Sequence, residues 1–283
     1  INVYTGSGDS WNQGADITSP SSQNGGRAGA ADTITIAGNR MIIGAPGEYG
    51  STGRAYLYDA LGNPISNFHY DASGSKVLDA GSLTFAPYSL NPDNNMGQDS
   101  IKNLNFGVGA SVISEGHYTI GSDITDIYYD KQEGIVYNFR QRGPDWFAGA
   151  TITPAALPTS QVGSGVARSG ENTVIGAQAY DDRGAVFVYT AGNAMPERLQ
   201  PTGLEIGADF GASVAVSGDR IVVGAPDAFD AKGAVYVFQR LAGNWSQQGD
   251  PISSTIGNGG FGTSVAIDVG TIVVGAPSSD QYG

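Results

Sequence analysis

Short apolar runs, separated by turns that contain glycine, recur along the whole chain. In the clearest copy, a run at residues 210–216 leads through Ser217-Gly218-Asp219-Arg220 to a second run that ends in Gly224-Ala225-Pro226. The runs are about four to six residues long and rich in β-branched and aromatic residues, as in strands joined by tight hairpins. Several runs are apolar on both faces, which is typical of strands covered on both sides. The pattern predicts β-strands and no helices in the core.

The copies follow one another at about fifty residues, with a longer first interval, and this period is typical of β-propeller blades. We therefore expect an all-β fold in which residues 1–283 form a single β-propeller of five four-stranded blades. The glycines that close the second run of each copy are Gly44, Gly121, Gly176, Gly224 and Gly275. The expected fourth strands are at residues 11–17, 65–70, 146–152, 195–199 and 245–252.

The two ends of the chain complement each other. The fifth copy stops where the others begin their third strand, whereas Ile1-Asn2-Val3-Tyr4 and the following Trp11 are similar to the third strand of the fourth copy and its Trp245. Residues 1–18 are thus expected to complete the last blade, so that the N-terminal strand closes the ring.

One segment does not repeat. Residues 71–105 are polar with scattered aromatic residues and lack helical periodicity. We interpret them as an insertion between blades one and two, exposed at the surface as long loops usually are.

Composition excludes several partners. The net charge is −13 and charged residues make up 14% of the chain, so nucleic acid and anionic membrane surfaces, which need a basic footprint, are disfavoured. No apolar stretch predicts membrane insertion, and the absence of cysteine excludes disulfides. An extracellular or cell-surface location is expected.

Candidate catalytic and metal-binding residues are sparse. His69 and His117 lie in different repeats, which disfavours a histidine-based triad or zinc site. Asp32 and Asp209, near the starts of first strands, are the visible carboxylates for glycoside hydrolysis, but they do not form a convincing pair. Four acidic residues in one loop fit no standard calcium spacing: Asp123, Asp126, Asp130 and Glu133. We therefore predict no catalytic residues, no bound metal and no cofactor.

The loops between second and third strands combine aromatic and acidic residues. In a propeller these loops emerge at the same end as the connections between blades, so they would form a rim. Aromatic rings stack on the C–H groups of sugars while carboxylates accept hydrogen bonds from hydroxyl groups. An alternative is that the acids only keep the loops solvated and the aromatic residues cover blade edges. The predicted ligand-binding residues are Glu48, Tyr49, Tyr180, Asp181, Asp227, Phe229, Asp280 and Tyr282.

Phe210-Gly211 with Gly224-Ala225-Pro226, and Phe261-Gly262 with Gly275-Ala276-Pro277, resemble the FG-GAP repeat family, which includes the propeller of integrin α subunits. The resemblance implies a propeller that works in extracellular adhesion or recognition. Integrin-type repeats carry a calcium loop rich in aspartate, whereas the equivalent turn here is Ser217-Gly218-Asp219-Arg220. That turn has too few oxygen ligands for calcium. The family's propellers usually have seven blades rather than five.

These features favour a non-catalytic recognition or adhesion module that is not an enzyme and binds a glycan or a partner protein through one propeller face. The alternative is a structural building block of an extracellular or surface assembly, for which self-association would be expected. A glycoside hydrolase is the less favoured third class.

Overall fold

The computed structural model describes residues 2–7, 10–16, 34–37, 40–45, 54–59, 67–70, 76–79, 82–83, 106–114, 117–122, 134–142, 145–148, 152, 160–254 and 259–277. Nearly all of the regular elements in this part of the chain are strands in antiparallel sheets. Two short turns interrupt them, η3 (Tyr180–Asp182) and α2 (Ala228–Ala231). The predicted all-β class is confirmed.

Two consecutive sheets, here called blades three and four, are described throughout their strands. In each, four strands pair in the order of the sequence. In blade four a short fifth strand, β21, also pairs with β19. Tight turns such as the one after Ser217 join the first two strands. Blade three contains β13 (Val162–Ser169), β14 (Asn172–Ala177), β15 (Ala185–Thr190) and β16 (Glu197–Leu199), and blade four contains β17 (Ser213–Ser217), β18 (Arg220–Ala225), β19 (Ala234–Leu241), β20 (Asn244–Gln247) and β21 (Ile252–Ser253).

Two further four-stranded sheets precede them along the chain. Blade two follows the same order, and blade one does so with β8 as its fourth strand. Blade one contains β3 (Ile34–Ala37), β4 (Arg40–Ala45), β5 (Arg54–Asp59) and β8 (Ser82–Leu83), and blade two contains β9 (Phe106–Ser114), β10 (His117–Ser122), β11 (Ile135–Arg142) and β12 (Asp145–Ala148).

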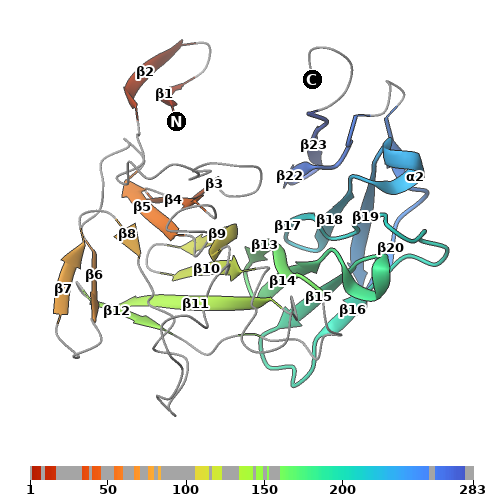
Figure 1. Cartoon of the computed structure of the whole chain (residues 1–283), viewed down its shortest axis with the longest axis horizontal. Coiled ribbons are helices and arrows are strands. Elements are labelled where there is room, and N and C mark those ends of the chain that lie inside the picture. Colours follow the sequence, from red (N-terminus) through yellow and green to blue (C-terminus); the bar gives the residue numbers. More distant parts are fainter. Residues whose placement is uncertain are drawn as a thin grey trace, which may run out of the picture.

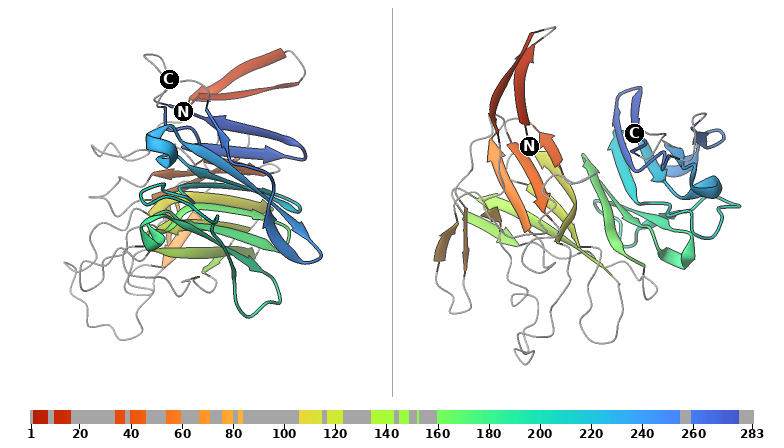
Figure 2. Two further views of the ribbon diagram at one scale, coloured as in Figure 1. Left: turned by 90° about the vertical axis from the view of Figure 1, so that its right-hand side faces the viewer. Right: turned by 45° about the horizontal axis from the view of Figure 1, so that its top comes forward.

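Successive blades pack side by side, with their first strands in contact: β9 with β13, β13 with β17, and β17 with β22. These strands lie toward the middle of Figure 1, and the fourth strands β12, β16 and β20 lie outside them. The left view in Figure 2 shows the sheets stacked one on another. This is the arrangement of consecutive propeller blades.

The repeated Phe-Gly and Gly-Ala-Pro residues hold neighbouring blades together. Phe210 forms a parallel bridge with Gly184 of the preceding blade, and its ring is fully buried. The ring meets Tyr236 edge to face, with ring centroids 5.2 Å apart. Burial of such a side chain stabilises the fold by about 1.5–3 kcal/mol. The same parallel bridge joins Gly233 to Phe261 one blade later.

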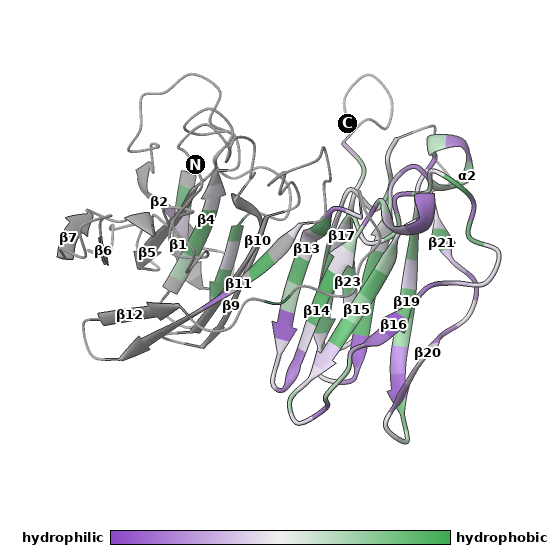
Figure 3. Ribbon diagram, turned by 60° about the horizontal axis from the view of Figure 1, so that its bottom comes forward, coloured by the Kyte–Doolittle hydropathy of each residue, from purple (hydrophilic) through white to green (hydrophobic). Residues whose placement is uncertain are grey.

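The core therefore lies between the blades. One cluster joins residues of blade three, including Val186 and Leu199, to Phe210 and Tyr236 of blade four. A second joins Val136 of blade two to Val162 and Ile175 of blade three. Figure 3 shows apolar residues in green along β14, β15 and β19, with polar residues in purple toward the turns.

Two hairpins stand at the ends of the row. β1 (Asn2–Ser7) pairs with β2 (Ser10–Asp16), and β22 (Ser264–Asp268) pairs with β23 (Thr271–Gly275). Among the described strands, β1 pairs only with β2, so the expected pairing of the N-terminal strand with the last blade is not observed. Figures 1 and 2 show the red and the blue hairpins as separate sheets. Val3 nevertheless packs against Met41, Ile43 and Tyr58 of blade one.

The predicted fourth strand of blade one is wrong. Residues 67–70 form β6 (Asn67–Tyr70), which pairs with β7 (Lys76–Asp79) in a local hairpin. The strand beside β5 is β8, which lies within the segment interpreted as an insertion. A hairpin with a short turn closes a smaller loop than a return to β5 and therefore loses less chain entropy.

Candidate functional site

The loops between second and third strands share one end of blades three and four with the connections between blades. Gly207 donates a backbone hydrogen bond to the Asp182 carbonyl (2.6 Å), and Phe210 donates one to the Arg183 carbonyl (3.0 Å). One blade later, Phe261 donates to the Lys232 carbonyl (3.1 Å). The expected neighbourhood of these two kinds of loop is thus present in both blades.

Tyr180 and Asp181 form the tip of this loop in blade three. The Tyr180 ring is half-buried and meets Phe187 edge to face, with centroids 5.5 Å apart. The guanidinium of Arg198 lies 5.5 Å from the ring centroid, and its NH1 donates a hydrogen bond to the Tyr180 hydroxyl at 3.1 Å. Asp181 is exposed and forms an ion pair with Arg183 at 3.5 Å. Tyr180 therefore packs against strand β15 and the side chain of Arg198.

Phe229 occupies the corresponding loop of blade four in an unusual backbone conformation. Phe229, Asp230 and Ala231 have φ values of 56°, 58° and 62°, in the left-handed region that residues other than glycine seldom adopt. The Phe229 backbone N–H donates a hydrogen bond to the Glu205 carboxylate, which fixes the turn. Phe229 is 42% exposed as a residue and is thus available for contact.

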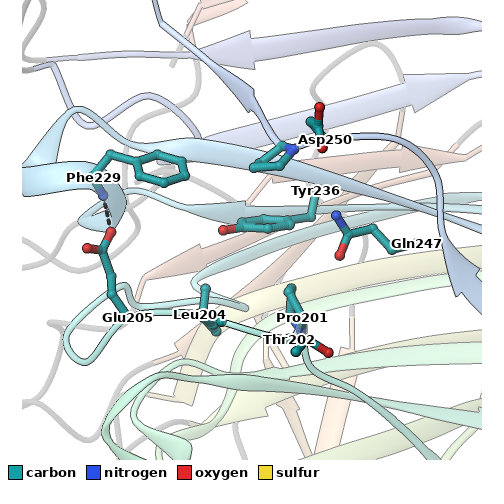
Figure 4. Close-up of a pocket in the computed structure, with 10 residues that line it drawn as sticks. Pro201, Thr202, Leu204, Glu205, Phe229, Tyr236, Gln247 and Asp250 are labelled. Carbon is teal, nitrogen blue, oxygen red and sulfur yellow. Dashed lines mark hydrogen bonds between the residues drawn. The ribbon is translucent and has the colours of Figure 1, made fainter.

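A cavity of about 300 Å³ opens beside Phe229. Its wall combines the rings of Phe229 and Tyr236 with the carboxylates of Glu205 and Asp250 and the amide of Gln247. Figure 4 shows the Tyr236 ring between Phe229 on one side and Leu204 and Pro201 on the other, with its hydroxyl directed toward Glu205. We call this cavity the Phe229 pocket. The residues that line it are Pro201, Thr202, Gly203, Leu204, Glu205, Phe229, Tyr236, Gln247, Asp250 and Pro251.

The pocket is built from segments that are distant in sequence. The connection between blades three and four supplies residues 201–205, the loop after β18 supplies Phe229, and strand β19 supplies Tyr236. The end of β20 and the residues after it supply Gln247, Asp250 and Pro251. Tyr236 is anchored by its contact with Phe210 in the core, so the floor of the pocket is part of the interface between the blades.

Negative charge collects around this end of blade four. Burial and the charge of Glu205 both raise the pKa of the Tyr236 phenol. Burial raises the pKa of Asp209 to about 6, and the charge of Asp227 adds to the rise. Asp209 and Asp227 thus lie close enough to interact, and their environments differ, because Asp227 is exposed whereas Asp209 is half-buried.

Only part of the predicted rim is brought together. Phe229 lines the pocket, whereas Asp227, Tyr180 and Asp181 do not. Four predicted residues, as well as the alternative catalytic residue Asp32, lie outside the described part of the chain: Glu48, Tyr49, Asp280 and Tyr282.

Sequence reasoning missed most of the pocket. The predicted residues did not include Tyr236, which lies in a third strand that repeats, or Glu205, Gln247 and Asp250, which lie in a fourth strand and in connections that differ between repeats. Two turn sequences could have indicated that these connections lie near each other. They are Pro201-Thr202-Gly203 and Asp250-Pro251, which follow the fourth strands of consecutive blades.

Within the described ranges, no three His, Cys, Asp or Glu side chains are grouped so that they could hold a metal ion. Among the same residues there is no helix of the length and apolarity needed to cross a membrane.

Comparison with known protein families gives one match, to a part of the chain. A profile of the FG-GAP repeat matches residues 197–238. No curated protein sequence is significantly similar to the chain.

Solved structures are similar to the chain at low sequence identity. The Trypanosoma rangeli sialidase in complex with 2,3-difluorosialic acid, a covalent intermediate, has a TM-score of 0.50 and 15% identity, and the match covers 94% of this chain and 44% of that one. Another structure of Trypanosoma rangeli sialidase gives 0.49 and 13%, with 94% and 45% coverage. An exo-β-1,3-galactanase from Phanerochaete chrysosporium with β-1,3-galactotriose gives 0.40 and 11%, with 78% and 49% coverage. The chain thus spans less than half the length of these proteins.

These comparisons correct one expectation and confirm another. The prediction of a non-catalytic recognition or adhesion module is contradicted: the solved structure that shares the fold with a TM-score of 0.50 is a sialidase. The resemblance seen at Phe210-Gly211 and Gly224-Ala225-Pro226 is confirmed by the match over residues 197–238. Residues 197–238 of the chain thus match the FG-GAP repeat, and its described strands form a propeller-like all-β fold.

Proposed function

We propose that this chain is a glycan-processing protein and that the Phe229 pocket holds a sugar ring. The observation that carries the proposal is the meeting of two aromatic rings, two carboxylates and an amide around one cavity of about 300 Å³. This volume is at the lower end of the range for small-molecule sites, which are mostly apolar with a few polar groups that fix orientation.

The pocket residues have complementary roles in this proposal. The exposed face of Phe229 stacks on the C–H groups of the ring, while Asp250 and Gln247 take part in hydrogen bonds with its hydroxyl groups. Stacking contributes about 0.5–1.5 kcal/mol beyond the buried area, and an exposed hydrogen bond contributes about 1 kcal/mol or less. Phe229 should therefore be the largest single contributor to affinity.

Glycoside hydrolysis is the reaction that we propose, with a carboxyl pair that lies outside the residues lining the Phe229 pocket. It needs two carboxyl groups in different protonation states, one as acid and one as base or nucleophile. Asp209, with its pKa raised to about 6, and the neighbouring Asp227 are the described pair that supports this assignment. The sialidase named above supports it through the shared fold.

The proposal is tested by measuring sugar binding and hydrolysis of nitrophenyl glycosides for the parent chain and for four variants. Phe229→Ala should lose most of the affinity, and Asp209→Asn should lose hydrolysis while it keeps binding. Tyr236→Phe, which removes one hydroxyl, should weaken binding by a smaller factor. Tyr180→Phe is the matched control outside the pocket and should behave as the parent. Equal binding by the parent and Phe229→Ala would contradict the placement of the sugar.

We also propose that the two terminal hairpins are the halves of a fifth blade in the order β22-β23-β1-β2, which would close the ring. The contact of Val3 with blade one supports this proposal, because the third strand of a last blade would pack there. An extracellular or cell-surface location remains part of the proposal, since complex glycans are abundant there.

A further inference from the structure

The Phe229 pocket is lined by acidic groups without basic ones. Glu205 and Asp250 are both exposed at the pocket, and none of the residues that line it is Lys or Arg. The turn that carries Phe229 also holds the exposed Asp230 and Lys232, neither of which lines the pocket.

Arg183 contacts the connection that lines the pocket, and its guanidinium is already engaged. The Nε of Arg183 donates a hydrogen bond to the Leu204 carbonyl at 3.1 Å, and its NH1 forms the ion pair with Asp181 at 3.5 Å. Its guanidinium therefore stabilises the connection that carries Leu204 and Glu205 and is not directed to a ligand. The carboxylates of the pocket therefore have no basic partner among the residues that line it.

The titration of neighbouring groups is consistent with a negative potential at this end of the blade. The charge of Glu205 contributes to the raised pKa of Tyr236, and the charge of Asp227 contributes to that of Asp209. A ligand carboxylate would meet the same repulsion, while a ligand ammonium group would be attracted.

We infer that the pocket selects sugars by charge: it accepts amine-bearing and neutral sugars and disfavours acidic ones. This inference rests on the proposed function and narrows its substrate class. It also separates this chain from the sialidase that shares its fold, whose structure holds 2,3-difluorosialic acid. The carboxylate of an acidic sugar needs a cationic partner to offset its desolvation, and the residues lining the pocket provide none.

The size of the expected discrimination follows from the exposure of the carboxylates. Exposed charge pairs change binding about two- to fivefold, and salt screens them. Amine-bearing sugars should therefore bind about two- to fivefold more tightly than their neutral counterparts, and acidic sugars more weakly by a similar factor.

The test uses two matched series of methyl glycosides: glucose, glucosamine and glucuronic acid, and galactose, galactosamine and galacturonic acid. Dissociation constants are measured by NMR titration in about 0.01 M and about 1 M salt, between which the Debye length falls about tenfold. The expected order is amine, then neutral, then acid, with the differences largely removed at high salt.

Two variants assign the effect to the pocket. Asp250→Asn should weaken binding of the amine and strengthen binding of the acid, while it leaves the neutral sugar nearly unchanged. Asp219→Asn is the control, because Asp219 is an exposed carboxylate in the turn at the other end of β18. It should leave the order and its magnitude as in the parent.

The outcomes separate the two claims. Acidic sugars that bind as tightly as neutral ones would overturn the selection by charge and leave the proposed function standing. An order that Asp219→Asn alters as much as Asp250→Asn would also overturn it, since the effect would then come from the net charge of the chain. Failure of every sugar in both series to bind would overturn the sugar pocket itself and the inference with it.

Discussion

The Gly211 carbonyl oxygen of blade four lies so close to the α-carbon of Gly176 in blade three that a Cβ at Gly176 would overlap it. The same relationship joins Gly262 to Gly224 one blade later. Hydroxyl groups support these contacts, since Ser164 Oγ donates to the Gly211 carbonyl at 3.2 Å and Ser213 Oγ donates to the Gly262 carbonyl at 2.7 Å. The repeated Phe-Gly and Gly-Ala-Pro residues are thus two sides of one joint between blades.

Gly176→Ala should therefore destabilise the protein strongly, by about 3–5 kcal/mol or to the point of misfolding, because the obstacle is backbone that cannot rotate away. Gly270→Ala is the control, since its Cβ would meet only the Arg220 side chain at 3.9 Å. Urea denaturation monitored by circular dichroism compares the two. Similar midpoints for both variants would show that the joint tolerates a methyl group.

Asp209 should make the folded state sensitive to pH. Its folded-state pKa is raised from 3.8 to about 6, so its contribution to stability is most favourable below pH 3.8 and is lost as the pH rises through about 6. Asp209→Asn should raise the melting temperature at pH 8 by about 2–4 °C, a shift discounted for the partial exposure of this carboxyl. The gain should disappear near pH 4. A gain of equal size at both pH values would contradict the assigned cause.

The closure of the ring can be tested with an engineered disulfide, since the chain has no cysteine. Val273 occupies the position in its hairpin that Val222 occupies in blade four, and Val222 pairs with Val237. Val3 matches Val237 in the same way, because Gly6 opposes Trp11 as Arg240 opposes Trp245.

Residues directly opposite in an antiparallel pair have α-carbons about 4.5–5.5 Å apart, which a disulfide can span. The double variant Val3→Cys, Val273→Cys should therefore oxidise to a monomeric crosslinked species and melt at a higher temperature. In the control, Ile272→Cys replaces Val273→Cys and points to the other face of the strand. Equal crosslinking in both pairs, or in neither, would argue against the fifth blade.

The sequence predicted the parts of the fold that repeat. The apolar runs and the turn before Arg220 are local features, and the structure places strands there with the expected order. It did not predict β8 as the fourth strand of blade one, because two residues, Ser82 and Leu83, give too weak a pattern. The competing run at 67–70 has a nearer partner in β7.

The pocket was less predictable than the fold for a related reason. Phe229 was named because its loop repeats an aromatic and acidic pattern, but the same pattern at Tyr180 yields a ring packed on Phe187 and bonded to Arg198. The two loops differ in the residue that forms a hydrogen bond with them. Glu205 holds the turn at Phe229 from a connection that differs between the repeats, and no local rule places that carboxylate there.

Glu205 should therefore act as a positioning residue for Phe229. Glu205→Ala removes the acceptor that holds a turn with three left-handed residues, so the Phe229 amide should exchange with solvent faster and sugar affinity should fall. Glu205→Gln keeps an acceptor oxygen and should restore most of the protection. Hydrogen exchange at the Phe229 amide, measured by NMR, checks both. If the Phe229 amide exchanged as slowly in Glu205→Ala as in the parent, Glu205 would not position Phe229.

The most direct test of the sugar pocket is the structure of the protein with the tightest-binding glycoside of the two matched series. The ring should lie against the exposed face of Phe229, with its hydroxyl groups within hydrogen-bonding distance of Asp250 and Gln247. A sugar bound at the loop of Tyr180, on the outer edges of the blades or at the opposite end of the strands would contradict the account.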